Sequence, residues 1–149
     1  MTEVSFYHLQ AQPLDQALPR LLEKVNERGM RALIRVKENE LMMHLNASLW
    51  TFSANSFLAH GIDQDAVPED QPLLLTTEHS GNVNNASVLV LLEDSAAPDV
   101  ADFDRCLYMF DGNDLQNLQA ARQRWTDMKA EGIDVTYWQQ EAGGWKKKA

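Results

Sequence analysis

The sequence predicts an α/β protein in which helices cover both faces of a mostly parallel central sheet. Two observations predict this class. Short apolar runs of strand length alternate along the chain with stretches that repeat at helical spacing. One run, SVLVLL at 87–92, is apolar almost throughout, as in a strand that is buried on both faces. The length of 149 residues fits one domain, 1–149, and no repeat or linker divides it.

The first half of the chain contains two strand–helix pairs. VSFYHL at 4–9 is rich in aromatic and β-branched residues and predicts a strand. Pro13 suits the first turn of a helix and Gly29 suits its end. Between them an apolar stripe repeats at helical spacing: Leu14, Ala17, Leu18, Leu21, Leu22 and Val25. RALIRV at 31–36 predicts a short buried strand, and a second helix with its own apolar stripe ends near Trp50.

The second half continues the alternation. Strands are expected at 73–77, 87–92, 105–110 and 133–138, with a short helix near 98–101. A long helix is expected from a cap at Asn113 or Asp114 to about Glu131, where Gly132 ends it. The remainder, 139–149, is polar and ends in three lysines before the last alanine, which predicts a flexible basic tail.

Composition and sequence pattern predict the cellular compartment of the protein. Hydrophobic residues make up 44% of the chain, enough for a sizeable core in a domain of this length. The longest apolar runs are far shorter than a membrane span, and the first ten residues lack the pattern of a secretion signal. Cys106 is the single cysteine, so no internal disulfide can form. These features predict a cytoplasmic protein without membrane contact.

Charge is distributed unevenly along the chain. The net charge of −9 argues against nonspecific binding to nucleic acid or to anionic membranes. Residues 39–104 contain no lysine or arginine and 11 acidic residues, whereas all 13 cations fall within 20–37 and 105–148. An anionic partner is therefore expected to dock on the two cationic blocks.

Signals for catalysis are weak. None of the seven glycines forms G-x-G-x-x-G or a phosphate-binding loop, and the turn after the first strand has no glycine. The histidines, which have no metal-site spacing, are His8, His44, His60 and His79. Cys106 lies in an apolar strand and is expected to be a packed thiol. A small nucleotide-binding α/β enzyme using Asp94 and His60 remains the alternative, and no cofactor or metal is expected.

The long C-terminal helix offers one candidate binding face. Its expected core stripe consists of Leu115, Leu118, Ala121 and Met128. Arg122, Trp125 and Lys129 are neighbours along one edge of that stripe. An indole flanked by two cations suits a short acidic peptide with an aromatic end. The alternative is that Trp125 belongs to the core, and Arg124 is expected to be an ordinary surface charge.

The stretch LWTFSANSFLAHG at 49–61 offers a second candidate face. It places Trp50, Phe52, Phe57 and Leu58 in a segment without the period of a helix or a strand. Aromatic side chains in such a connection either cover the core of their own protein or anchor a partner. The pattern alone does not choose between a lid and a docking surface.

These features together resemble the chi subunit family of bacterial DNA polymerase III. The resemblance covers essentially the whole chain and is carried by FYHL, GMRALIRV, LW with SFLAHG, PLLLT, VLVLL and the ending ARQRW, EGIDVTYWQQ and GGWKKKA. It implies a Rossmann-like three-layer fold without known catalytic activity. It also implies two partners, the psi subunit of the clamp loader and the acidic, Phe-ending C-terminal tail of single-stranded DNA-binding protein. A repair helicase can compete for the psi face.

The resemblance also assigns residues to these partners. Trp50 and Phe57 match aromatic positions that face psi or the helicase, with Leu58 and His60 beside them. The residues implied for the tail-binding pocket are Arg122, Trp125 and Lys129, with Phe110 and either Trp138 or Trp145 as walls. Under this reading the aromatic stretch is a docking surface. A third possibility is direct binding of single-stranded DNA by Arg122, Trp125 and the lysine tail.

Overall fold

The computed structural model describes residues 2–10, 12–51, 58–142 and 144–149. Within them, eight strands form one sheet in the order β3-β4-β2-β5-β6-β1-β7-β8. The strands are β1 (Glu3–Leu9), β2 (Ala32–Arg35), β3 (His60–Ile62), β4 (Leu73–Thr76), β5 (Val88–Leu92), β6 (Arg105–Asp111), β7 (Asp134–Glu141) and β8 (Gly144–Lys147). The helices are α1 (Leu14–Glu27), α2 (Asn39–Thr51) and α3 (Leu115–Ala130), with 3₁₀ turns η1 (Pro68–Asp70) and η2 (Val100–Asp102). Strands β1 to β7 are parallel, and β8 runs antiparallel to β7.

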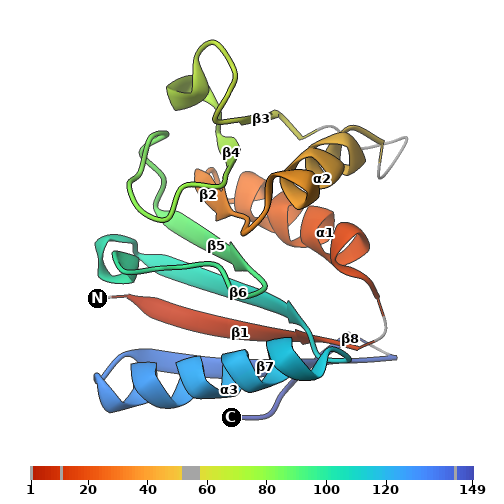
Figure 1. The fold of residues 1–149 in the computed structure, drawn as a ribbon, viewed down its shortest axis with the longest axis vertical. Helices are drawn as coiled ribbons and strands as arrows, with labels where there is room; N and C mark the ends of the chain where they lie inside the picture. The colour runs from red at the N-terminus through yellow and green to blue at the C-terminus, as the bar shows by residue number, and fades with distance from the viewer. Residues whose placement is uncertain (1, 11, 52–57, 143) are drawn as a thin grey trace.

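The three-layer arrangement confirms the predicted class (Figure 1). Helices α1 and α2 pack on one face of the sheet and α3 packs on the other, so two apolar cores form. Side chains of each strand alternate between these cores because successive residues point to opposite faces. On β1, for example, Phe6 joins the core under α3, whereas Leu9 joins the core under α1 and α2.

Two sequence expectations about the residues from 115 onward are wrong. The segment 139–149 was expected to be a tail, but it contains the end of β7 and the added strand β8. Its polar composition hides this pairing, because an edge strand meets solvent. Leu115, expected in the core stripe of α3, is 67% exposed. It is the first residue of the helix and precedes the first buried residue, Ala121, by nearly two turns.

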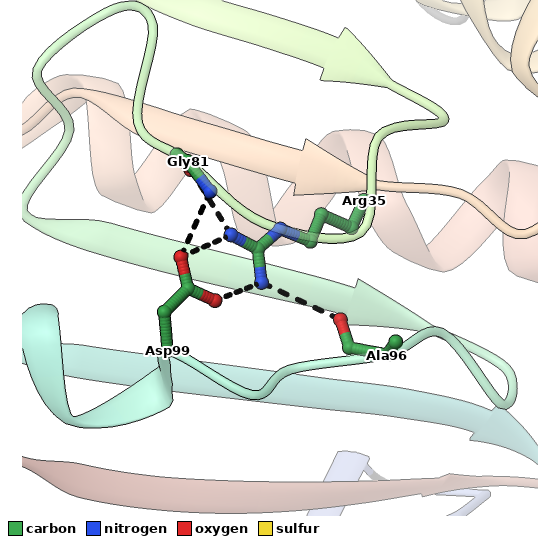
Figure 2. Close-up of polar contacts among 4 residues, drawn as sticks. All are labelled: Arg35, Gly81, Ala96 and Asp99. Carbon is green, nitrogen blue, oxygen red and sulfur yellow. Dashed lines mark hydrogen bonds and ion pairs between the residues drawn. The ribbon is translucent and has the colours of Figure 1, made fainter.

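A buried ion pair joins the end of β2 to the loops that follow β4 and β5 (Figure 2). Arg35 is 1% exposed, and its two terminal nitrogens donate to the two carboxylate oxygens of Asp99 at 2.6 and 2.7 Å. The same guanidinium donates to the carbonyl oxygens of Gly81 and Ala96. The Gly81 N–H also donates to Asp99, so one side chain joins β2 to two loops. The hydrogen bonds from Arg35 hold the pKa of Asp99 below its usual range.

Candidate peptide-binding hollow beside helix α3

A surface hollow of about 500 Å³ lies between α3 and the strands β1 and β7. Its lining residues are His8, Arg122, Trp125, Thr126, Tyr137, Gln139, Lys148 and Ala149. The Asp114 carboxylate caps the first turn of α3 by accepting hydrogen bonds from the amides of Gln116 and Asn117. The backbone of 148 and 149 pairs with Tyr137 on β7, which brings Lys148 to the rim. We call this feature the α3 hollow.

The indole of Trp125 is half-buried and belongs both to the core and to the α3 hollow. Its ring meets Phe6 and Tyr137 edge-on, with centroids 5.5 and 5.7 Å apart. Lys129 places its ammonium nitrogen 5.6 Å from the centroid of the Trp125 ring. Because the aromatic neighbours fix the indole, its accessible part is a preorganised apolar surface beside a cation.

Strand β1 supplies a histidine that orders the floor of the α3 hollow. Nδ1 of His8 and the hydroxyl of Tyr137 share a hydrogen bond of 2.7 Å. Burial and the nearby Arg122 lower the pKa of His8, which disfavours a charged imidazolium in the hollow. Gly112 makes room for the ring, since a Cβ at this position would lie 1.8 Å from Nε2 of His8. The positive charge of the hollow therefore comes from arginine and lysine.

The exposed Arg122 is the cation best placed for a ligand. Its side chain lines the α3 hollow next to Trp125. Lys148 also lines it, although its ammonium already contacts the Glu141 carboxylate at 3.2 Å. An arginine fork beside an indole can pair with a carboxylate while the ring covers an apolar side chain. The sequence spacing predicted this juxtaposition of Arg122, Trp125 and Lys129.

The expected walls of the pocket are different in the structure. Phe110 is fully buried beneath Tyr137 and does not line the α3 hollow. Trp138 and Trp145 lie on the opposite face of the sheet, against α1. They were assigned to the wrong face because the sequence does not reveal which residues of β7 point toward α3. The aromatic wall is Tyr137. Alternation along β7 places Tyr137 and Trp138 on opposite faces, and the sequence alone favours neither residue as the one that faces α3.

Arg124 is not the ordinary surface charge that its helical position suggested. Its side chain is only 18% exposed, and its guanidinium carbon lies 4.7 Å from the centroid of the Tyr108 ring. It also contacts the Asp94 carboxylate at 3.5 Å. Arg124 is therefore a packing residue between α3 and the sheet, and Asp94 serves as its surface partner.

The face around Trp50 presents a single large indole. Trp50 is 53% exposed, and its ring centroid lies 4.4 Å from that of His60. His60 is buried in β3, and its ring nitrogens contact the carbonyl oxygens of Leu58 and Asn46. His60 thus packs against Trp50, and Leu58, which is 2% exposed, belongs to the core. Phe52 and Phe57 lie outside the described residues.

The crevice where Rossmann-like sheets bind nucleotides is acidic here. At the carboxyl ends of β1, β5 and β6 a hollow of about 350 Å³ is lined by Glu93 and Asp111, among others. Burial raises the pKa of Glu93 to about 7, and the carboxylates of Asp111 and Asp114 add to the shift. A phosphate in this crevice would meet negative charge, which opposes the nucleotide-binding alternative.

Other candidate chemical groups occupy packed or solvated positions. Cys106 is fully buried, and burial raises its pKa to about 12, as a packed thiol requires. Across 2–10, 12–51, 58–142 and 144–149, no three histidine, cysteine or acidic side chains gather in a way that could hold a metal ion. No helix in the same ranges has the length and apolar character needed to cross a membrane.

The fold and the α3 hollow define a class: an α/β protein with a cationic, aromatic surface hollow and an acidic sheet crevice. A model of the family described as DNA polymerase III chi subunit, HolC, matches residues 1–136. The chain belongs to this family, as the resemblance from the sequence indicated. It is also similar to "Probable DNA polymerase III subunit chi" of Rickettsia prowazekii (strain Madrid E), with 36% identity over 92 residues. That match covers 62% of this chain and only 55% of the relative's length.

Proposed function

We propose that this protein is a non-catalytic, cytoplasmic accessory subunit that links the clamp loader to single-stranded DNA-binding protein during replication. In this proposal the α3 hollow holds the acidic C-terminal tail of single-stranded DNA-binding protein. The observation that carries the proposal is the exposed Arg122 beside the half-buried Trp125 in a hollow of about 500 Å³. Family membership supports the setting in DNA polymerase III.

Charge and shape both suit such a tail. An otherwise acidic protein of net charge −9 offers Arg122 and Lys148 around this hollow, with Lys129 against the indole. Tail carboxylates would pair with Arg122, and a terminal phenyl ring would cover Trp125 and Tyr137. A short peptide with few anchors binds weakly, on the order of micromolar, and exposed charge pairs weaken in salt.

The second partner in this proposal is psi, which would dock on the face that contains Trp50. A half-exposed indole supported by a buried histidine is typical of an interface anchor. A repair helicase would compete for the same face. Trp50→Ala is expected to weaken capture of psi or of the helicase and to leave binding of the acidic tail unchanged.

Fluorescence anisotropy with a labelled acidic peptide ending in Phe tests the tail-binding proposal. Arg122→Ala is expected to weaken binding about tenfold, because it removes a charge-assisted pair worth about 1.5 kcal/mol. Trp125→Phe keeps the ring contacts with the core and removes part of the apolar surface, so a smaller loss is expected. Lys37→Ala is the matched control, because it also removes one exposed cation. Lys37 follows β2, which is separated from β7 by three strands of the sheet. Unchanged binding in Arg122→Ala would refute the assignment of this hollow.

Direct binding of single-stranded DNA is the second candidate, and the same variants test it. The lysines of β8 and Arg122 could contact phosphates, but the net charge opposes a long polyanion. Titration with a thymidine oligonucleotide near physiological salt is expected to give no tight binding. Tight binding that is lost in Arg122→Ala would replace the adaptor proposal with direct DNA binding.

A further inference from the structure

A second cationic, aromatic hollow lies on the opposite face of the sheet, where α1 leaves β6, β1 and β7 uncovered. It has a volume of about 410 Å³. Its lining residues are Ser5, Tyr7, Leu21, Lys24, Val25, Arg28, Met30, Val88, Arg105, Leu107, Thr136, Trp138 and Trp145. A neighbouring hollow of about 370 Å³ shares Tyr7, Leu21, Lys24 and Trp145 with it, so the two adjoin each other. We call the pair the α1 groove.

The depth of the α1 groove has a simple origin in the strand registers. Ser5 on β1 is the register partner of Leu107 on β6 and of Thr136 on β7. Ser5 and Thr136 are small and hydrogen-bond to each other at 3.2 Å, so the floor is low at this level. Two residues further along the strands, Tyr7 and Trp138 are register partners. The Tyr7 ring meets the Trp145 ring of β8 edge-on, with centroids 5.1 Å apart. Aromatic walls therefore rise next to a low polar floor.

Positive charge gathers around the first of the two hollows. Lys24, Arg28 and Arg105 are exposed lining residues, and no acidic residue lines that hollow within the described chain. The pKa of Tyr7 is raised by burial, while a hydrogen bond with Ser5 and the charges of Arg105 and Arg28 oppose the rise, so both guanidinium groups act on the groove. Lys147 pairs across β7 and β8 with Trp138, on the same face. This concentration is notable in a chain of net charge −9.

We propose that the α1 groove is a second docking site for an acidic peptide segment that carries a bulky apolar side chain. Carboxylates of the segment would pair with Arg28 and Arg105, and its apolar side chain would lie between Trp138 and Trp145. The proposal goes beyond the proposed function, since it concerns the other face of the sheet and does not depend on Arg122.

A peptide suits the α1 groove better than a nucleic acid does. Aliphatic side chains such as Leu21, Val25 and Met30 form one wall, which favours an aliphatic or aromatic side chain over a stacked row of bases. Glu27 lines the neighbouring hollow, so an acidic segment is confined to the hollow that Lys24, Arg28 and Arg105 line. A peptide, unlike a nucleic acid strand, can carry its negative charges only at the positions that face Arg28 and Arg105.

The two sites together make the protein bivalent for acidic peptides. Adjacent residues of β7 serve them separately, because Tyr137 points to the α3 hollow and Trp138 points to the α1 groove. Two acidic tails presented by one partner could bind opposite faces of the sheet at once. Such double attachment raises the overall affinity without any new contact, provided that the linkers reach both sites.

Calorimetric titration with the acidic, Phe-ending peptide tests this inference through its stoichiometry. Two peptides per chain are expected for the unaltered protein. In Arg122→Ala one of the two is expected to bind about tenfold more weakly. In the double variant Arg28→Ala, Arg105→Ala the other is expected to weaken by up to about 25-fold, because each exposed pair contributes up to about fivefold in affinity. Thr136→Leu, which fills the low floor and leaves the cations, should abolish the same site. Lys37→Ala is the control for the loss of a single exposed cation.

The outcomes separate the two sites. Loss of binding in Arg122→Ala with no effect of Arg28→Ala, Arg105→Ala and a stoichiometry of one would overturn the α1 groove as a peptide site. The reverse pattern would support the groove and refute the tail site at α3. Two further results would overturn the inference: an octathymidylate that binds the groove in place of the peptide, or a dimer of this chain that Arg28→Ala, Arg105→Ala converts to a monomer in sedimentation.

Discussion

Replacement of Asp99 by alanine is expected to destabilise the whole domain. Asp99 accepts two hydrogen bonds from the buried Arg35 and a third, of 3.0 Å, from the Gly81 amide. Without it, the guanidinium, 1% exposed, keeps only the carbonyl oxygens of Gly81 and Ala96 as partners. The variant therefore leaves a buried charge uncompensated and releases two loops from β2.

The expected cost follows from this geometry. Breaking a buried ion pair by removing one partner costs about 3–5 kcal/mol. This is a large share of the roughly 5–15 kcal/mol by which a domain is stable. For a chain of this length the melting temperature should fall by about 2–4 °C per kcal/mol, so a loss of 4 kcal/mol corresponds to about 8–16 °C.

Urea denaturation followed by circular dichroism measures the effect. Asp94→Ala is the control, because its carboxylate is 49% exposed and contacts Lys37 at 3.9 Å and Arg124 at 3.5 Å. This variant should cost less than about 1 kcal/mol. The double variant Arg35→Met, Asp99→Ala should recover part of the loss, since no buried charge remains. If Asp99→Ala costs no more than Asp94→Ala, the reasoning about the buried pair is wrong.

Three further predictions concern other sites. The pKa of Glu93 is raised to about 7, so the folded state holds this proton more tightly than the unfolded state does. The free energy of unfolding should therefore fall as pH rises from about 4.5 to 7. In urea titrations, Glu93→Gln should match the unaltered protein at pH 5 and exceed its stability by about 1 kcal/mol at pH 8. Gly112→Ala should cost about 2 kcal/mol and reduce peptide binding at the α3 hollow, because the new methyl displaces the ring of His8; unchanged stability and binding would contradict that packing. Leu115→Ala should change stability by less than about 0.5 kcal/mol, whereas Met128→Ala, at a position 7% exposed, should cost about 2–3 kcal/mol, and equal losses in thermal melts would contradict the assigned helix faces.

The periodicity of the sequence was enough to predict the class and most of the elements. The helix cap at Asp114 and the helix end near Gly132 agree with the structure, because capping chemistry is local. The apolar run at 87–92 forms the buried strand β5, as expected for a run without polar alternation. Arg122 and Trp125 were identified together because neighbours on one helix follow directly from spacing.

Contacts between distant elements could not be predicted in the same way. Arg35 and Asp99 are 64 residues apart, and nothing in RALIRV indicates that its second arginine is buried. Trp138 was placed on the wrong face because β7 is half-buried on both faces, which removes the polar and apolar alternation that reveals orientation. Arg124 looks solvent-facing on a helical projection, and only the sheet register brings the Tyr108 ring beneath it.

The position of β1 in the sheet has a consequence for how the chain is made. Its two neighbours in the sheet are β6 and β7, and Glu3 lies opposite both Arg105 and Asp134, which follow it by 102 and 131 residues. The sheet cannot close around β1 until the residues of β7, Asp134–Glu141, have left the ribosome. Pairings across such sequence separations slow folding. β1 therefore stays unpaired while the residues between it and β7 are synthesised, and an unpaired apolar strand is prone to aggregation.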